Sequence, residues 1–532
     1  MRLTRTLPWL LSALTLTMSQ AAAAAAQRPR VVIAAGALQG TLAAGAPGAV
    51  FKGIPFARPP VGPLRWRAPL PAVPWRGVRD AAHFSPACMQ GGRGGPTGSE
   101  DCLYLNVWTP EWPARSRHPV MLWLFGGANA VGSASDPTLD GASLARHGVV
   151  VVTANYRPGV MGFMAHPALS AESPHGSSGN YALLDQLLAL RWIRENIGRF
   201  GGDPHHVTLF GQSSGAFDVM VLMTSPLARG LFVDAIAESG QLLSFGGPMP
   251  KARAERIGLH IAADLHAPPG AAALGYLRGL PAAAVGGAAA KWLPADIDSR
   301  EHLDSDNGLL TNVDGWVLPD SPARVFAAHR EMPIPLIVGN NAREITPNVA
   351  LDRLRSVIAT RYGDLAPKAL EAYGLANGGT GHPDPLRGGP GAQWMTDIVQ
   401  RCAAILESDW HAAAGHPTWE YQFERTLPGK EAAGSTHGAE VAFVFGTLHS
   451  APGAPAFTAS DRAASRQMQE YWARFAIAGD PNGAGLPFWP RAGDGHYLAF
   501  TERGLRVAVG LESEPCAVYR EWIGRRLAAH SP

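Results

Sequence analysis

Mostly apolar runs recur along the chain, at residues 120–125, 149–154, 207–210, 232–237 and 334–338, and the run at 120–125 is continuous. A run without alternating polar positions is typical of a strand that is buried on both faces. Between the second and third runs, residues 181–200 place apolar side chains at helical spacing. Strands that alternate with helices in this way predict a parallel α/β sheet.

The segments around this core show weaker patterns. Residues 31–56 alternate apolar and small residues with glycine breaks, which predicts antiparallel edge strands. Residues 262–294 are rich in Ala, Gly and Leu and are expected to form a helical cap or insertion over the sheet. The later pattern predicts a loop at 377–390, a helix at 397–414, a strand at 418–423, and helices at 463–478 and 514–529. Neither a repeat nor a linker separates these segments, so residues 27–532 are expected to form a single domain.

The N-terminus has the pattern of a secretory signal peptide. Arg2 and Arg5 precede an apolar run at 7–16, and a stretch of small residues at 21–26 follows. The apolar run is too short to cross a membrane. We therefore expect residues 1–26 to be removed and the mature protein to be secreted or periplasmic.

Composition narrows the possible partners. The 532 residues are 46% hydrophobic and 17% charged, enough to build a large buried core. The net charge is +2, from 45 basic and 43 acidic residues, and no basic block stands out. A nucleic-acid partner is therefore not expected.

The four cysteines are Cys88, Cys102, Cys402 and Cys516. An even number in an exported protein favours disulfides, and four cysteines allow three pairings. Their spacings do not fit a zinc site, so we expect no metal ion on them.

Residues 211–215 carry the motif G-x-S-x-G, after an apolar run and before a helix start. This arrangement places a serine, here Ser213, on a sharp turn at the top of a parallel sheet. The glycines avoid a steric collision across that turn. In a chain with 61 glycines the motif alone also fits a chance match.

A serine hydroxyl needs a histidine to take its proton and a carboxylate to orient that histidine. In chain order the sequence offers Glu344, just after the run at 334–338, and His437, after the strand expected at 418–423. The chain has 18 histidines, and Asp314 and Asp320 are alternatives for the acid. The residues alone leave this choice open.

Several motifs, taken together and in order, resemble the type-B carboxylesterase family, which includes cholinesterases, para-nitrobenzyl esterases and fungal lipases. They lie at residues 53–65, 100–107, 179–186, 200–204, 211–215, 339–344 and 437–446. The resemblance implies an α/β-hydrolase fold, with a large, mostly parallel sheet flanked by helices and helical cap insertions. It also implies a serine carboxylesterase that acts on small-molecule esters without a cofactor or metal ion.

The resemblance assigns roles to single residues. Ser213 would be the nucleophile, Glu344 the acid and His437 the base, with oxyanion N–H donors from Gly127, Ala128 and Ser214. Ser239 matches a serine that hydrogen-bonds near the acid, and Arg65 and Glu100 match a structural salt bridge. The implied disulfides are Cys88–Cys102 and Cys402–Cys516.

The chain departs from the family pattern beside the expected site. Gln212 stands where a glutamate is usual, which removes a negative charge. Phe125, Ala128 and Asn129 differ from the family's glycine-rich oxyanion motif. We expect Ala128 to keep an ordinary negative φ and to donate normally. The alternatives are a lipase that acts on longer acyl chains, or a binding homologue with weak catalysis.

Overall fold

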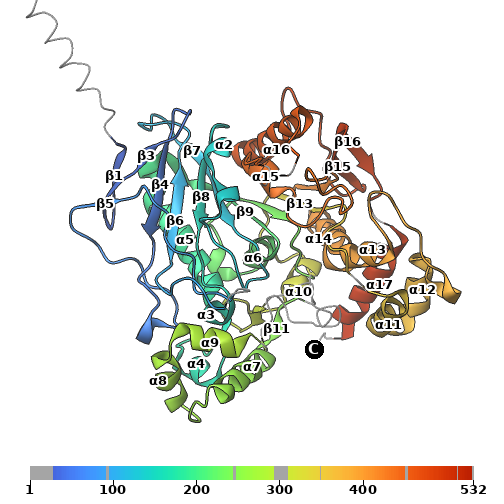
Figure 1. Ribbon diagram of the computed structural model, residues 1–532, viewed down its shortest axis with the longest axis horizontal. Helices are drawn as coiled ribbons and strands as arrows, with labels where there is room; N and C mark the ends of the chain where they lie inside the picture. The colour runs from blue at the N-terminus through green and yellow to red at the C-terminus, as the bar shows by residue number, and fades with distance from the viewer. Residues whose placement is uncertain are drawn as a thin grey trace, which may run out of the picture.

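An 11-stranded sheet runs through the part of the chain that the computed structural model describes, in the order β16-β15-β14-β13-β10-β9-β7-β8-β6-β4-β3 (Figure 1). The described residues are 28–91, 95–243, 247–290, 292, 310–347, 349–449, 453, 455–511 and 513–529. The signal peptide predicted at 1–26 lies outside them.

The central strands are parallel, as the apolar runs predict. They are β8 (Val150–Ala154), β7 (His118–Leu124), β9 (Gly202–Gln212), β10 (Asp234–Glu238), β13 (Leu336–Asn341), β14 (Thr418–Phe423) and β15 (His496–Thr501). Antiparallel strands complete both edges: β6 (Tyr104–Trp108), β4 (Ala49–Pro55) and β3 (Thr41–Leu42) on one side, and β16 (Gly504–Val509) on the other. The chain therefore has the predicted α/β-hydrolase architecture.

Alternate side chains of the central strands face two separate cores. In β7, Leu122 and Leu124 belong to one buried cluster, and Met121 and Trp123 belong to the other. The first cluster is covered by α5 (Tyr181–Asn196), α6 (Ser214–Leu222) and α14 (Cys402–Ala413), and the second by α15 (Val441–Phe445) and α16 (Ala459–Ala478). Burial on both faces explains why these strands read as continuous apolar runs.

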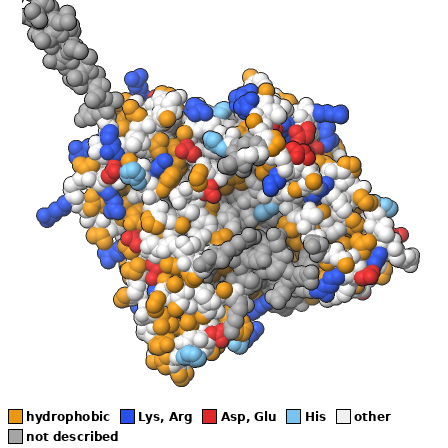
Figure 2. Space-filling view, viewed as in Figure 1, with side chains coloured by type: hydrophobic (Ala, Val, Ile, Leu, Met, Phe, Trp, Pro, Cys, Tyr) orange, Lys and Arg blue, Asp and Glu red, His pale blue; other side chains and the backbone are white. Residues whose placement is uncertain are grey.

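The helical insertion predicted at 262–294 is present as α8 (Ala272–Gly279) and α9 (Ala282–Ala289), and it is preceded by α7 (Lys251–Asp264), most of which lies before the predicted range. With α4 (Pro167–Glu172) these helices form the lower end of the molecule in Figure 1. In Figure 2, hydrophobic side chains are frequent there, and basic and acidic side chains are scattered over the rest of that face. This scatter agrees with the near-neutral net charge.

The remaining elements are shorter or lie at the periphery. The strands are β1 (Arg30–Ile33), β2 (Gly36–Gln39), β5 (Val78–Asp80), β11 (Met249–Pro250) and β12 (Asn312–Val313). The helices are α2 (Ala142–Ala145), α3 (Gly159–Phe163), α10 (Pro322–Ala327), α11 (Leu351–Tyr362), α12 (Ala366–Ala372), α13 (Pro390–Thr396) and α17 (Glu514–Ala529). Among the helices described, none is long and apolar enough to cross a membrane.

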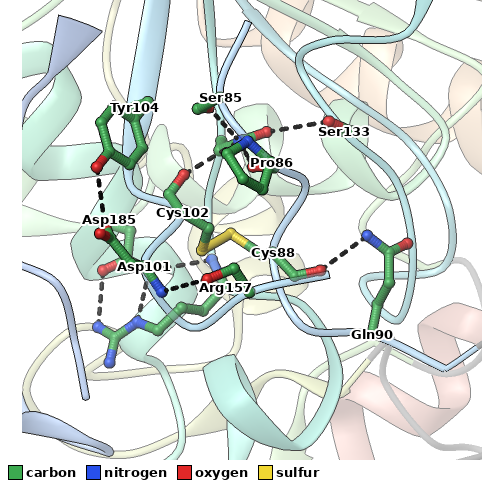
Figure 3. Close-up of a disulfide and its surroundings, with 12 residues drawn as sticks. Ser85, Pro86, Cys88, Gln90, Asp101, Cys102, Tyr104, Ser133, Arg157 and Asp185 are labelled. Atoms are coloured by element: carbon green, nitrogen blue, oxygen red, sulfur yellow. Dashed lines mark hydrogen bonds and ion pairs between the residues drawn. A yellow bond between two sulfur atoms is a disulfide. The ribbon is translucent and has the colours of Figure 1, made fainter. Parts of the chain in front are cut away.

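Two disulfides join Cys88 to Cys102 and Cys402 to Cys516, the pairing that the resemblance implies. The first closes a short loop beside β6, shown in Figure 3, and the second ties α17 to α14. The implied salt bridge between Arg65 and Glu100 is also present, with 2.6 Å between Nε and Oε1.

Candidate active site

Ser213 lies on the turn between β9 and α6, with φ +57° and ψ −128°. A Cβ on Gly211 would lie 2.7 Å from the carbonyl oxygen of Leu124, and one on Gly215 would lie 2.1 Å from the same oxygen. Only glycine fits at both positions, which is the steric reason for the motif. The strained serine is held by its own N–H, which donates to Glu238 O at 2.8 Å.

Ser213, His437 and Glu344 form one chain of hydrogen bonds. His437 Nε2 lies 2.8 Å from Ser213 Oγ, and His437 Nδ1 lies 2.7 Å from Glu344 Oε2. The three residues follow β9, β14 and β13, so parallel strands bring their loops to the same edge of the sheet. The two alternative acids lie elsewhere: Asp314 Oδ1 accepts from backbone N–H groups at 316 and 318, and Asp320 pairs with Arg324.

Glu344 is fixed at several atoms. Its Oε1 accepts from the N–H of Asn341 at 2.6 Å, and its own N–H donates to Thr396 Oγ1 at 3.0 Å. The backbone carbonyl of Glu344 accepts from the N–H of His437 at 2.9 Å. Both carboxylate oxygens are thus committed, and the orientation toward the imidazole is set before a substrate arrives.

Two further buried carboxyl groups, those of Glu440 and Glu238, lie near the hydrogen-bonded triad. Burial, and then the charge of Glu344, raises the pKa of Glu440 to about 7. Burial, and then the charge of Glu440, raises the pKa of Glu238 well above its ordinary value. The amide of Asn341 donates to Glu440 Oε2 and to the carbonyl of Thr436, so it links the loop of Glu344 to the loop of His437.

Gln212 and Ser239 also lie beside these residues. Gln212 Nε2 is 3.3 Å from His437 Nε2, the nitrogen that faces Ser213. Ser239 Oγ is buried and has no hydrogen-bond partner among the residues described, so the hydrogen bond that the resemblance implies for it is not formed. Ser239 contributes its backbone instead: its φ is +50° and its N–H donates to Gly339 O at 2.9 Å.

The loop at 126–132, which we call the oxyanion loop, turns beside Ser213. The expectation of a negative φ at Ala128 is wrong, because φ is +55° there and +57° at Asn129. The N–H of Ala130 donates to Gly127 O at 2.9 Å, so Ala128 and Asn129 are the central residues of a four-residue turn. Positive φ at both central positions is the mark of a type I′ turn, which favours Asn and Gly. Alanine there costs about 1–2 kcal/mol.

Side chains from three elements hold this turn. Asn129 Nδ2 donates to Asp218 Oδ1 on α6 at 2.9 Å, and Gln186 Nε2 on α5 donates to Asp218 Oδ2. At the far end of the loop, Gly132 N donates to Gln90 Oε1 at 2.7 Å, and Gln90 Nε2 donates to Gly132 O at 2.9 Å. Figure 3 places Gln90 next to the Cys88–Cys102 disulfide. Burial raises the pKa of Asp218 to about 7.

The three expected oxyanion residues lie in the oxyanion loop, at Gly127 and Ala128, and at the start of α6, at Ser214. Gly127 has φ +124°, and in the described part of the chain the N–H groups of Gly127 and Ala128 donate to no protein acceptor. Ser214 is the first residue of α6, where a helix leaves its N–H groups unpaired and carries a partial positive charge. The three amides are therefore available to an anion beside Ser213.

Several residues that shape the site were not singled out from the sequence, among them Gln90, Asn129 as an anchor, Asp218, Asn341 and Glu440. Asp218 carries a readable signal, because it is an acidic position within the apolar helix that follows Ser213. A buried charge at such a position needs hydrogen-bond donors. Its partners lie 32 and 89 positions away, and only the fold identifies them.

Comparisons with known proteins agree with this geometry. The model of the Carboxylesterase family matches residues 27–519. A fumonisin B1 esterase of Sphingopyxis macrogoltabida is 37% identical over 466 residues, which cover 83% of this chain and 81% of the relative. Carboxylesterase 4A of Bos taurus is 35% identical over 514 residues, which cover 88% of this chain and 90% of the relative.

Solved structures share the same architecture. A PNB esterase superposes with a TM-score of 0.78 at 30% identity and covers 92% of this chain and 99% of its own. A carboxylesterase of Geobacillus stearothermophilus superposes with a TM-score of 0.76 at 32% identity and covers 93% of this chain and 100% of its own.

Proposed function

We propose, from the premise that this chain belongs to the carboxylesterase family and is a carboxylic ester hydrolase, that it works through an acyl-enzyme on Ser213. The observation that carries the proposal is the hydrogen-bonded chain from Ser213 through His437 to Glu344. Such a chain turns a weak hydroxyl nucleophile into a reactive one.

In the first half of the reaction, Ser213 Oγ attacks the ester carbonyl carbon while its proton passes to His437 Nε2. Glu344 stabilises the imidazolium from the Nδ1 side. The tetrahedral intermediate then breaks its bond to the alcohol oxygen, which leaves with the proton from His437. In the second half, water gives a proton to His437 Nε2 and attacks the acyl carbon. The bond from that carbon to Ser213 Oγ then breaks, Oγ regains the proton from His437, and the acid is released. The reaction needs no cofactor or metal ion.

The amides of Gly127, Ala128 and Ser214 are proposed to donate to the oxyanion of each intermediate. The positive φ values at Gly127 and Ala128, in a loop whose Gly126 packs against Ser213, and the partial positive charge at the start of α6 support this proposal. An ordered set of donors costs no reorganisation during the reaction, which is the source of its catalytic value.

We further propose that residues 1–26 direct export and are removed, and that residues 27–532 work as one domain on a small-molecule ester. Two disulfides among the described residues support an oxidising destination outside the cytosol. The signal peptide itself rests on the sequence pattern of positive, apolar and small residues.

The test is covalent labelling of the purified enzyme with a fluorophosphonate, followed by peptide mass spectrometry. We expect one label per chain, on Ser213, and none on the Ser213→Ala variant. Unmodified Ser213 in a protein that hydrolyses esters would refute the mechanism. A protein that neither labels nor hydrolyses any ester would instead support the binding homologue.

A panel of esters that varies acyl length and alcohol would then define the substrate. A preference for long acyl chains would favour the lipase alternative, with α7 to α9 as the element that covers the site. Fumonisin B1 belongs in the panel because a relative is named for its hydrolysis.

A further inference from the structure

Glu331, His411 and His416 gather at the opposite end of the sheet from Ser213. Glu331 precedes β13 and His416 precedes β14, whereas Glu344 and His437 follow those same strands. His411 lies in the last turn of α14. The nearest ligand atoms of the three side chains all lie within 4.8 Å of one another. Their role is not explained by the ester chemistry.

The hydrogen bonds of His411 define which of its nitrogens faces the cluster. His411 Nε2 lies 2.8 Å from the backbone carbonyl of Ile334, which accepts only, so Nε2 carries a proton. His411 Nδ1 lies 2.8 Å from Glu331 Oε1, and both side chains are fully buried. In the neutral imidazole this contact would set two lone pairs against each other. A positive species, a proton or a metal ion, must therefore lie between them.

Glu331 has unused binding capacity. Its second oxygen, Oε2, is buried and has no hydrogen-bond partner among the residues described. A buried carboxylate oxygen without a partner is costly, so its presence needs a physical reason. A metal ion beside the carboxylate supplies one, because it compensates the charge of both oxygens.

His416 completes the set from the solvent side. Its Nε2 lies 4.0 Å from Glu331 Oε1, and its side chain is 18% exposed. A tetrahedral ion with bonds of about 2.0–2.1 Å keeps its ligand atoms roughly 3.3 Å apart. Glu331 Oε1 lies 2.8 Å from His411 Nδ1 and 4.0 Å from His416 Nε2. Each of these two distances therefore differs from that spacing by less than an ångström.

We propose that Glu331, His411 and His416 bind a divalent transition metal ion, with Zn²⁺ as the preferred one. Two imidazoles and one carboxylate are a ligand set that Zn²⁺ takes, with a fourth position left for water. The carbonyl of Ile334 orients His411 from behind, as is usual for histidines that bind metals. The ion would fasten the end of α14 to the starts of β13 and β14, so it acts on stability and leaves ester hydrolysis unchanged.

The experiment treats the full mature protein with a chelator, removes the chelator, and titrates Zn²⁺ while measuring bound metal by mass spectrometry and the melting temperature. We expect one tightly bound Zn²⁺ per chain and a rise in melting temperature. His416→Ala is the main variant, because His416 is partly exposed and its loss leaves the buried pair intact. It should bind Zn²⁺ at least about tenfold more weakly. His205→Ala, which removes an exposed histidine elsewhere, should match the wild type.

Two results would overturn the proposal. The first is a wild type that retains no Zn²⁺, in which case a proton alone joins His411 to Glu331 as an ion pair. The second is Zn²⁺ that binds His416→Ala as tightly as the wild type and stops ester hydrolysis, which would place the ion on His437. Glu331→Gln gives an independent check, because it keeps the size of the side chain and removes the charged ligand.

Discussion

Asn129 Nδ2 donates to Asp218 Oδ1 across 2.9 Å, and this hydrogen bond joins the oxyanion loop to the helix that begins next to Ser213. The loop presents the proposed donors of Gly127 and Ala128, and the helix presents that of Ser214. The bond therefore fixes the relative position of two parts of one anion site, on elements 89 positions apart in the chain.

Replacing Asn129 by Ala should lower kcat by about tenfold to a hundredfold with a smaller change in KM. The physical reason is that a displaced oxyanion donor costs up to roughly 3 kcal/mol in the transition state. Steady-state kinetics on a soluble ester measure the effect. Asn196→Ala is the control. Asn196 is buried away from the site, where it accepts from Ala34 N and donates to Trp192 O, so this substitution should lower stability alone. Equal kcat in Asn129→Ala and the wild type would refute the positioning role.

Asp218→Asn should change how stability depends on pH. Burial raises the pKa of Asp218 from 3.8 to about 7, so between these values the folded state keeps a proton that the unfolded state has lost. Stability from this group is therefore lost as pH rises through that window, by at most roughly 4 kcal/mol. Asparagine has no proton to lose, so the loss should vanish.

Chemical denaturation of both proteins at pH 5 and pH 8 tests this. The variant should gain stability relative to the wild type at pH 8 and not at pH 5. Gln186 Oε1, which is buried and without a partner in the described chain, offers an acceptor for the new amide if the Gln186 side chain flips. A constant difference between the proteins at both pH values would show that Asp218 does not titrate in this range.

Ala128→Gly should keep kcat within about tenfold of the wild type, since glycine takes the φ of +55° freely and retains the N–H donor. Relief of the strain, about 1–2 kcal/mol, is offset by the entropy of the added glycine, about 0.5–1 kcal/mol. The variant should thus be as stable as the wild type or slightly more so. Ala134→Gly, at a buried alanine outside the left-handed region, should be destabilised. A clear loss of stability in Ala128→Gly would contradict the turn geometry.

Glu440→Gln should move the acidic limb of the kcat/KM profile to lower pH by about half a unit, roughly 0.7 kcal/mol. Burial raises the pKa of Glu440 to about 7, and the charge of His437 partly opposes this rise, so by reciprocity an ionised Glu440 favours the imidazolium. Removing that charge makes the neutral, proton-accepting imidazole available at lower pH. Glutamine can still accept from Asn341, so the loops stay linked. An unmoved limb would mean that Glu440 acts only as a structural hydrogen-bond acceptor.

How far the sequence predicts this structure depends on the kind of interaction. The central strands were predictable because burial on both faces leaves continuous apolar runs such as 120–125. The hairpin of β15 and β16 was not predicted, because exposed and partly buried positions follow no regular alternation in β16 and give no clear apolar stripe. The helices at 351–362 and 366–372 were also not predicted, although the buried residues of the first, Leu354, Val357, Ile358 and Tyr362, follow helical spacing.

In the active site, too, some features were predictable from the sequence and others were not. The family resemblance assigned Ser213, Glu344 and His437, and the structure joins the three side chains by hydrogen bonds at one edge of the sheet. The conformation of Ala128 was predicted wrongly, because a type I′ turn depends on the hydrogen bond from Ala130 to Gly127 rather than on the preference of alanine. The expected φ was based on the preference of Ala128 alone, whereas the turn is formed by four residues, 127–130.

The disulfide that contributes more to stability should contribute less to activity. In a chain-entropy model, closing a loop of about 14 residues contributes roughly 3 kcal/mol and closing one of about 114 contributes roughly 5 kcal/mol. Replacing Cys402 and Cys516 by serine should therefore cost more stability, because their separation is 114 positions against 14 for Cys88 and Cys102. The shorter loop, however, carries Gln90, which holds both backbone groups of Gly132 in the oxyanion loop.

The double variant Cys88→Ser with Cys102→Ser should thus lose more kcat, by about tenfold, while remaining the more stable of the two. Denaturation under non-reducing conditions and kinetics at a temperature where both variants are folded measure the two effects. Gln90→Ala with both disulfides intact separates the causes, since it removes the contact to Gly132 and keeps the cross-link. If that variant keeps full kcat while the disulfide variant loses it, the cross-link acts on the site by a route other than Gln90. If the variant without Cys402–Cys516 shows the larger loss of kcat, the assignment of activity to the short loop is wrong.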